Sequence, residues 1–291
     1  MDMIKYSLIV PSINRTQELV RLFESLDQQT LRDFEVILVD QNQDERLVSI
    51  VEYFSHRLII KHIPSEIKGA ACARNIGIAH AQGEVLLWPD DDCWYPSTLL
   101  QDIDCLFSTN SNAAGIIGIL VDEKGNSFNR WKPTKVAPAT IMDAFIHAGE
   151  PAIIMKKDIV LKVGGFDDAI GIGAETLWGA GESTDLCVRV KKTGANLIIA
   201  PSIRIFHPNL KILPGDLSQR QKAYNYARGM GGIVKKNHLN VLFIIIYFFT
   251  YVRAIMWNGL QFNWDQAGYH WTRLKGVVEG WARYPEQMNG V

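Results

Sequence analysis

The first half of the chain alternates between short apolar runs and segments whose apolar residues recur every three or four positions. The apolar runs predict strands over residues 7–11, 34–39, 58–63 and 85–88. The helical spacing predicts helices over residues 16–28, 47–54 and 70–81. Strands and helices that take turns in this way, with short polar connections, predict a mostly parallel sheet covered by helices on both faces.

The alternation is less regular in the middle of the chain. There we expect strands over residues 116–121, 152–156 and 195–200, and helices over residues 140–148, 158–163 and 185–193. Residues 171–181 contain four glycines and predict a mobile loop. From residue 219 onward the sequence becomes helical and aromatic. We therefore predict one domain over residues 1–214 and a helical extension over residues 215–291.

The helical extension contains the most apolar stretch of the chain, residues 241–252. This run is shorter than the roughly 20 residues that a membrane-spanning helix needs, and it can be lengthened only by including Arg253. Lysines precede the run and tryptophans follow it, namely Lys235, Lys236, Trp257, Trp264, Trp271 and Trp281. Such flanks favour peripheral membrane contact through residues 236–260. A buried helix and a spanning helix are the alternatives.

Composition and charge narrow the possible partners only slightly. The 291 residues are 47% hydrophobic and 21% charged, as in ordinary folded proteins. The formal net charge of −1 gives no reason to expect a nucleic-acid partner. The four cysteines lack metal-ligand spacing and predict reduced thiols. Because the first strand is expected almost at the amino terminus, we predict no signal peptide and a cytoplasmic protein, placed at the inner face of the cell membrane if the extension contacts lipid.

Three consecutive aspartates, Asp90, Asp91 and Asp92, directly follow the expected strand over residues 85–88. Neighbouring carboxylates repel one another, and burying them is costly unless a cation or hydrogen-bond donors compensate. A hard divalent metal is the simplest compensation, and a solvated turn or a helix cap is the alternative. Ser12 and Asp40 also follow expected strands, so we predict that they share one crevice with the triplet at the carboxyl ends of the strands.

Several segments, taken in order, resemble the family-2 glycosyltransferases with the GT-A fold. The donor-side segments are residues 9–15 (IVPSINR), 36–40 (VILVD), 69–77 (GAACARNIG) and 83–96 (GEVLLWPDDDCWYP). The acceptor-side segments are residues 164–167 (GGFD) and 181–189 (GESTDLCVR). The resemblance covers about residues 5 to 210. It implies an inverting transfer of a sugar from a nucleotide-sugar donor, with a UDP-sugar expected, to a saccharide or lipid-linked saccharide in cell-surface polysaccharide synthesis.

The resemblance also implies a divalent metal, Mn²⁺ or Mg²⁺, that stabilises the charge of the leaving diphosphate. Asp90 and Asp92 match the outer members of the family's Asp-X-Asp motif. Asp92 is the expected metal ligand, and Asp90 is expected to serve the ribose or the metal. Asp91 is assigned to the donor site with its role open. His207 follows the last expected strand, where some relatives place a metal ligand, and a structural histidine is the alternative.

The same resemblance assigns further residues to the donor site. Asp40 is expected to bind the base or the ribose, with a turn or cap residue as the alternative. The remaining candidates are the loop residues Pro11 and Ser12, the cations Arg15 and Arg74, the pair Lys68 and Gly69 before a helix, and Asn75. Asn75 has a simpler alternative role as a brace for a turn. Arg74 has one as the partner of a carboxylate in the triplet.

The acceptor side departs from the family at one position. Relatives often read Glu-Asp where this chain reads Glu182-Ser183, and a serine cannot act as the base at neutral pH. We therefore expect Glu182 to deprotonate the acceptor hydroxyl, with Asp185 as the second candidate. Asp185 has the alternative role of beginning a helix. Trp178 is expected to stack on the acceptor sugar, unless it is a core residue.

Two other functions compete with this prediction. A sugar nucleotidyltransferase would share the crevice and the acidic metal site, but it usually has a glycine-rich loop near the amino terminus. Residues 11–15 contain no glycine, which counts against it. A nucleotide-sugar-binding assembly protein without transferase activity is the other alternative, and Ser183 is its only support.

Overall fold

The computed structural model describes residues 4–129, 132–208 and 213–285. The chain forms two compact units. The first contains Met1–Asp167 and Leu186–Asn209, and the second contains Asp168–Asp185 and Leu210–Val291. The second unit thus takes a short excursion of the chain, residues 168–185, in addition to the helical extension that the sequence predicted from residue 215.

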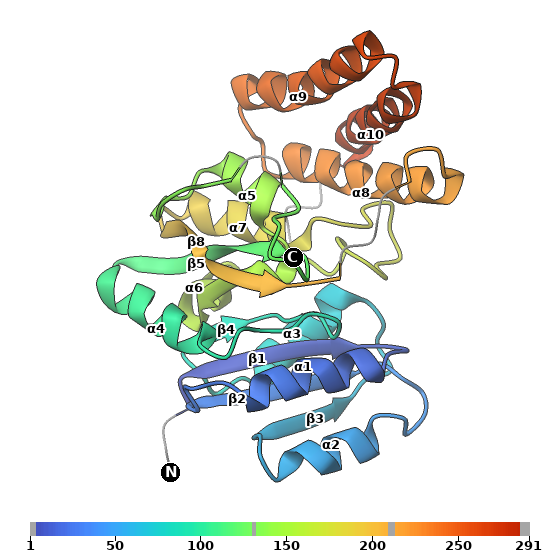
Figure 1. Ribbon diagram of the computed structural model, residues 1–291. Helices are drawn as coiled ribbons and strands as arrows, with labels where there is room; N and C mark the ends of the chain where they lie inside the picture. The colour runs from blue at the N-terminus through green and yellow to red at the C-terminus, as the bar shows by residue number, and fades with distance from the viewer. Residues whose placement is uncertain (1–3, 130–131, 209–212, 286–291) are drawn as a thin grey trace. The chain divides into compact units, whose positions relative to one another are not determined.

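The first unit is built on an eight-stranded sheet with the order β3-β2-β1-β4-β7-β5-β8-β6 (Figure 1). Its strands are β1 (Tyr6–Ser12), β2 (Phe34–Asp40), β3 (Ile60–Pro64), β4 (Val85–Leu87), β5 (Ala113–Val121), β6 (Ala137–Pro138), β7 (Ile153–Lys156) and β8 (Asn196–Phe206). The strands β3, β2, β1 and β4 are parallel, as are β5 and β8. The strands β7 and β6 run antiparallel to their neighbours. The predicted GT-A arrangement of a mostly parallel sheet is confirmed.

Helices cover both faces of this sheet. They are α1 (Gln17–Asp27), α2 (Val48–Ser55), α3 (Ala70–His80), α4 (Leu99–Thr109), α5 (Ile141–His147), α6 (Lys157–Lys162) and the short 3₁₀ helix η1 (Glu150–Ala152). The helix α7 (Glu182–Lys192) begins in the second unit and ends in the first. It starts three residues before the predicted helix, and its first turn contains both Glu182 and Asp185.

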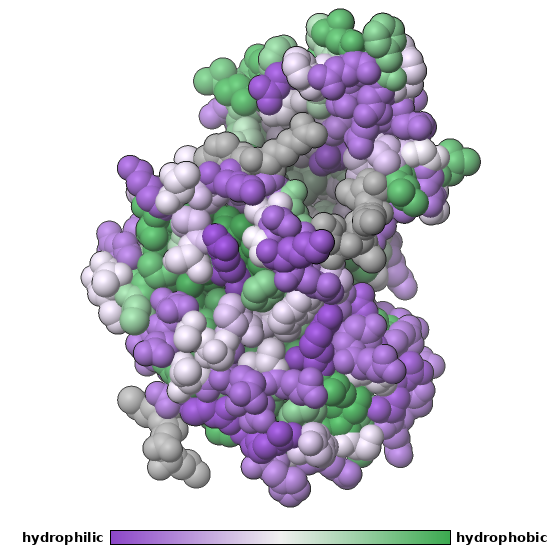
Figure 2. Space-filling model, in the orientation of Figure 1, coloured by the Kyte–Doolittle hydropathy of each residue, from purple (hydrophilic) through white to green (hydrophobic). Residues whose placement is uncertain are grey.

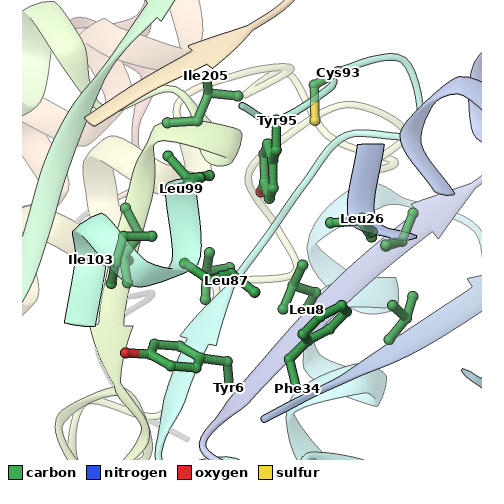
Figure 3. Close-up of a cluster of buried hydrophobic side chains, with 14 of the residues drawn as sticks. Tyr6, Leu8, Leu26, Phe34, Leu87, Cys93, Tyr95, Leu99, Ile103 and Ile205 are labelled. Carbon is green, nitrogen blue, oxygen red and sulfur yellow. The ribbon is translucent and has the colours of Figure 1, made fainter. Parts of the chain in front are cut away.

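Alternate residues of the central strand β1 enter two separate apolar cores. Tyr6, Leu8 and Val10 pack on one face with leucines from α1 and α4 (Figure 3). Ile9 packs on the other face with Ala73 of α3. Both faces of the strand are therefore dry, which is why its sequence is apolar without a polar alternation. The cores fix the strands, and so fix the positions of the polar residues that follow them.

The second unit is helical, with α8 (Leu217–Lys236), α9 (Val241–Leu260) and α10 (Trp264–Arg283). The helix α10 packs on both α8 and α9. Glycines let α8 and α10 approach backbone to backbone. A Cβ atom on Gly280 would lie 1.9 Å from the carbonyl oxygen of Arg228, and one on Gly231 would lie 2.0 Å from that of Val277. Larger residues at these positions would force the two helices apart.

The helix α9 is long and apolar enough to cross a membrane, and 11% of its most apolar window is buried. Length and composition alone do not separate a spanning helix from one that lies at a membrane surface.

Candidate active site

The polar residues at the carboxyl ends of the strands meet at one edge of the sheet. Ser12 ends β1 and Asp40 ends β2, and the two are direct partners in the parallel register. The acidic triplet follows β4, the other neighbour of β1. The Ser12 hydroxyl donates a hydrogen bond to Asp91 Oδ2 at 2.8 Å. The triplet is therefore attached directly to the end of β1.

Asp91 has the most fully satisfied carboxylate of the triplet. Arg15 Nη1 lies 2.5 Å from its Oδ1, and Ser12 bonds the other oxygen. Burial raises the pKa of Asp91, although Arg15 and Ser12 oppose this effect. Arg15 also lies 2.9 Å from Asp92 Oδ2, so one guanidinium bridges two of the three carboxylates. These contacts give Asp91 a role in holding the loop. They place Arg15 beside the triplet, and its predicted contact with the diphosphate stays a prediction.

Asp90, Asp92 and His207 form a cluster that suits a divalent cation. One ligand atom from each of these residues lies within 4.8 Å of the others. His207 Nε2 is 3.3 Å from Asp92 Oδ1, and that oxygen is buried without a hydrogen bond among the described residues. A buried carboxylate oxygen of this kind is costly unless something binds it. Two carboxylates and one imidazole are a donor set that Mn²⁺ and related ions accept.

The charges of the cluster are strongly coupled to their surroundings. Burial raises the pKa of Asp90 to about 6, although the Arg74 guanidinium opposes this shift. Burial acts in the same direction on Asp92, but the nearby His207 and Arg15 outweigh it and lower the pKa of Asp92. Asp92 in turn raises the pKa of His207 against the effect of burial. The cluster thus combines one carboxyl that resists ionisation with an ionised carboxylate next to an imidazole.

A pair of aromatic residues positions Asp92 opposite His207. Trp94 and Phe206 exchange two backbone hydrogen bonds of 3.0 and 3.1 Å, and their rings stack with centroids 5.5 Å apart. The Arg21 guanidinium lies 4.1 Å from the Trp94 ring and donates to the Asp92 carbonyl at 2.6 Å. The sequence prediction missed Arg21, Trp94 and Phe206. The sequence gives one indication of their role: Trp94 closely follows the acidic triplet, and Phe206 directly precedes His207.

Arg74 and Asn75 extend from α3 toward different partners. Arg74 is 3% exposed, and its Nη2 lies 3.0 Å from Asp90 Oδ1. This is the ion pair that the sequence left open as its alternative role. The Asn75 side chain donates to the Phe166 carbonyl and accepts from the Phe166 backbone N–H, both at 2.9 Å. Asn75 thus braces the segment that contains Gly165 and Phe166, and its predicted contact with the nucleotide stays a prediction.

The predicted base-binding residues lie at the end of β2 and beside it. Asp40 is buried, accepts hydrogen bonds from the backbone and side chain of Asn42, and lies 2.9 Å from His62 Nε2. Lys68 is exposed, and Gly69 has a φ of 112° where α3 begins. Only glycine adopts this conformation readily. Pro11 is half-buried in β1, one residue before Ser12.

The second unit contains Glu182 and Asp185, the two candidates for the base. Asp185 is fully buried, and Lys236 Nζ and Asn237 Nδ2 each lie 2.9 Å from one of its two oxygens. The helix α7 starts at Glu182, and Asp185 lies in its first turn. Glu182 is also buried. Its carboxyl carbon would lie 2.7 Å from a Cβ atom on Gly171, a residue with a φ of +122°.

Trp178 lies in the interior of the second unit. It is 6% exposed, and its ring centroid is 5.4 Å from that of Tyr284. The Trp178 carbonyl accepts a hydrogen bond from the Gly171 N–H at 2.8 Å, which closes the glycine-rich loop. This placement agrees with the core role, which the sequence left open as the alternative. Stacking on an acceptor sugar stays a prediction.

Comparisons with known proteins place these features in a family. The model of the family described as "Glycosyl transferase family 2" matches residues 7–162, more than half of the chain. An uncharacterized glycosyltransferase of Haemophilus influenzae is 34% identical over 170 residues, which cover 56% of this chain and 57% of that protein. The amylovoran biosynthesis glycosyltransferase AmsB of Erwinia amylovora is 25% identical over 217 residues, 70% of each chain.

The match to another relative covers a smaller share of it. The poly(ribitol-phosphate) beta-N-acetylglucosaminyltransferase TarS of Staphylococcus aureus is 31% identical over 163 residues, which are 54% of this chain and 28% of that protein. The chain therefore spans less than two thirds of the length of both TarS and the Haemophilus protein.

Solved structures show the same fold. The structure of TarS residues 1–349 has a TM-score of 0.62 at 15% identity, covering 94% of this chain and 91% of that one. A mannosyltransferase of Pyrobaculum calidifontis, solved with GDP-Man and Mn²⁺, has a TM-score of 0.58 at 14% identity, covering 96% of this chain and 74% of that one. At these identities the likeness concerns the fold alone.

Proposed function

Because this chain belongs to glycosyl transferase family 2, we propose that it is an inverting glycosyltransferase that moves a sugar from a nucleotide-sugar donor to the hydroxyl of a saccharide or a lipid-linked saccharide. The observation that carries the proposal is the cluster of Asp90, Asp92 and His207 at the carboxyl ends of the parallel strands. Ligands of such sheets bind at this edge. We assign catalysis to residues 1–214 and treat residues 215–291 as an extension.

The proposed donor is a UDP-sugar. TarS has been solved with UDP and with UDP-GlcNAc, and the mannosyltransferase with GDP-Man, so the base is a property to be tested in this chain. Asp40 and the backbone of Pro11 and Ser12 would hold the base and ribose. Arg15 and the segment Lys68–Gly69 would face the diphosphate, since a guanidinium and free backbone N–H groups both bind phosphate.

The proposed metal is Mn²⁺ or Mg²⁺, held by Asp90, Asp92 and His207. The unbonded Asp92 Oδ1 supports this fit, because a cation would satisfy an oxygen that the described residues leave without a hydrogen bond. When bound, the metal would stabilise the negative charge of the diphosphate. Arg74 would keep the Asp90 carboxylate oriented through its 3.0 Å ion pair.

The proposed base is Glu182. Asp185 stays the second candidate, and Lys236 and Asn237 hold its two oxygens in the interior of the second unit. Glu182 stands beside the glycine-rich loop, next to Ser183, which occupies the place of the aspartate in many relatives.

The proposed acceptor is a saccharide polymer or its lipid-linked precursor. AmsB is named for amylovoran biosynthesis and TarS for transfer to poly(ribitol-phosphate), and these names support the proposal. We propose that residues 236–260 make peripheral contact with the inner face of the cell membrane. The apolar helix α9 supports this placement. It would hold the enzyme near an acceptor carried on a lipid.

A thermal-shift screen of UDP- and GDP-sugars, with and without Mn²⁺, tests the donor and the metal together. A ligand at 100 times its Kd stabilises the native state by about 2.7 kcal/mol. We expect one nucleotide class to raise the melting temperature, and the rise to be larger with Mn²⁺. Absence of a shift with every nucleotide-sugar would overturn the proposed function.

The variant Glu182→Gln then separates a transferase from a binding protein. We expect the donor shift to persist while transfer falls roughly 100-fold or more, because the base is lost. Glu175→Gln is the matched control, since Glu175 is an exposed glutamate in the same glycine-rich loop. If the wild type binds donor but transfers to no membrane extract, the protein is a binding module.

A further inference from the structure

One face of α9 is apolar and open to solvent. Its exposed residues recur at helical spacing and are mostly large: Val241, Leu242, Ile245, Ile246, Phe249, Val252, Met256, Trp257 and Leu260. Apolar, green residues gather over α9 in Figure 2. The sequence of α9 contains a single charged residue, Arg253, which also lies on the exposed side. Exposed apolar surface of this extent marks an interaction site.

The opposite face of α9 is packed inside the second unit. Tyr247 and Tyr251 are buried, and their hydroxyl oxygens are 3.0 Å apart. The Arg273 guanidinium of α10 lies 5.1 Å from the centre of the Tyr251 ring. This polar face would have to enter the hydrocarbon layer if α9 crossed a membrane while packed on α10, and charged side chains are costly there. The geometry therefore favours a helix that lies at a surface.

The apolar surface continues through the turn between α9 and α10. Phe262 is 81% exposed, and its ring contacts that of Trp264 edge to face, with centroids 6.3 Å apart. The Trp264 ring lies 3.8 Å from the position of a Cβ atom on Gly259, near the end of α9. Aromatic rings at such a boundary prefer the head-group region of a lipid layer.

The charge of the helical region indicates an anionic occupant. Residues 213–285 contain nine lysines and arginines but three aspartates and glutamates, a formal charge of +6. With the four acidic residues of 168–185, the described part of the second unit carries +2, whereas the whole chain carries −1. Two of the lysines lie over tryptophans of α10, with Lys235 Nζ 5.5 Å from the Trp281 ring and Lys275 Nζ 5.4 Å from the Trp271 ring. A second copy of this positively charged region would be repelled, whereas anionic head groups would be attracted.

We propose that α9 and the turn to α10 lie in the plane of an anionic lipid surface, with the outer face of α9 among the upper acyl chains and Arg253 at the phosphates. This inference rests on the membrane contact in the proposed function and specifies its geometry and its lipid. It does not depend on sugar transfer. Only the outer face of α9 would contact lipid chains, because its other face is packed inside the second unit. Such binding is interfacial and reversible.

Sedimentation with vesicles tests this inference on the full chain. We expect the wild type to bind vesicles of phosphatidylcholine and phosphatidylglycerol at least 10-fold more tightly than vesicles of phosphatidylcholine alone, and to be released at high salt or alkaline pH. The variant Ile245→Glu should weaken binding at least 5-fold, and Phe249→Glu combined with Trp257→Glu should abolish it. Ile59→Glu is the matched control, because Ile59 is 57% exposed in the first unit and Ile245 is 59% exposed.

Three results would overturn the inference. The first is a wild type that stays in solution with anionic vesicles at low salt. The second is a protein that only detergent extracts from vesicles, which would make α9 a spanning helix. The third is a dimer by light scattering that Phe249→Glu dissociates, without any vesicle binding, which would make the face a contact between copies. Circular dichroism of each variant checks that it is folded, and the donor thermal shift tests the proposed function separately.

Discussion

Asp92 and Asp185, one in each unit of this protein, are held by different sets of partners. In the first unit, Asp92 keeps one buried oxygen without a hydrogen bond among the described residues, 3.3 Å from His207. In the second unit, Asp185 is fully buried, and both of its oxygens have a cationic or amide partner at 2.9 Å. A buried carboxylate that loses one partner destabilises the fold, whereas a buried oxygen without a hydrogen bond favours a ligand. The difference separates a structural aspartate from a candidate ligand without reference to sequence position.

The largest effect is expected from breaking the satisfied pair. Lys236→Met should lower the free energy of unfolding by about 3–5 kcal/mol, because it leaves the Asp185 charge buried without its cation. Denaturation followed by tryptophan fluorescence measures this loss. Lys222→Met is the matched control, since Lys222 is an exposed lysine on the same helix, α8. Equal losses in the two variants would contradict a structural role for Asp185.

Asp92→Asn should have the opposite profile. We expect transfer to fall roughly 100-fold or more, which is about 3 kcal/mol of barrier, while the unfolding free energy changes little. Rates measured over a Mn²⁺ titration check the first expectation, and denaturation checks the second. Asp102→Asn serves as the control, because Asp102 is an exposed aspartate on α4. A strong loss of stability with unchanged transfer would place Asp92 in the same class as Asp185.

The smallest effect on stability is expected at Asp104, a partly exposed carboxylate on α4. Asp104 pairs with Lys5 and accepts a hydrogen bond from the Tyr6 hydroxyl at 2.7 Å, and these two partners lower its pKa. Asp104→Asn should cost about 0.5–1 kcal/mol at neutral pH. Because the folded pKa is depressed, this contribution is present above about pH 4 and is lost as the pH falls. Stability curves of both proteins should therefore converge in acid, and a constant difference would contradict the assignment.

The sequence predicted the strands well because burial on both faces leaves a continuous apolar run. It also predicted that Ser12, Asp40 and the triplet meet, because the carboxyl ends of parallel strands share one edge. It did not predict that β7 runs antiparallel to its neighbours, because an apolar run does not indicate the direction in which its strand pairs. The predicted boundary near Pro214 did not include the excursion of residues 168–185 into the second unit.

The contacts that the sequence could not predict are those between distant residues. Asp185 and Lys236 are separated by 51 positions, and nothing local to either one indicates the other. The stacked pair of Trp94 and Phe206 joins the triplet to the end of β8 in the same way. Trp178 was open to two roles because an isolated tryptophan is equally suited to a core and to a sugar. Its packing on Tyr284 is seen only in three dimensions, and stacking on an acceptor sugar stays a prediction.

The glycine contacts between α8 and α10 have a consequence for how the second unit opens. Each glycine costs an isolated helix about 1 kcal/mol relative to alanine, so neither helix is expected to persist alone. The same glycines let the backbones of α8 and α10 come into contact, as at Gly280 and Arg228. Amide hydrogens on α8 and α10 should therefore exchange with solvent in one concerted event. The outer residues of α9 depend on this event too, since α9 is held in place through α10.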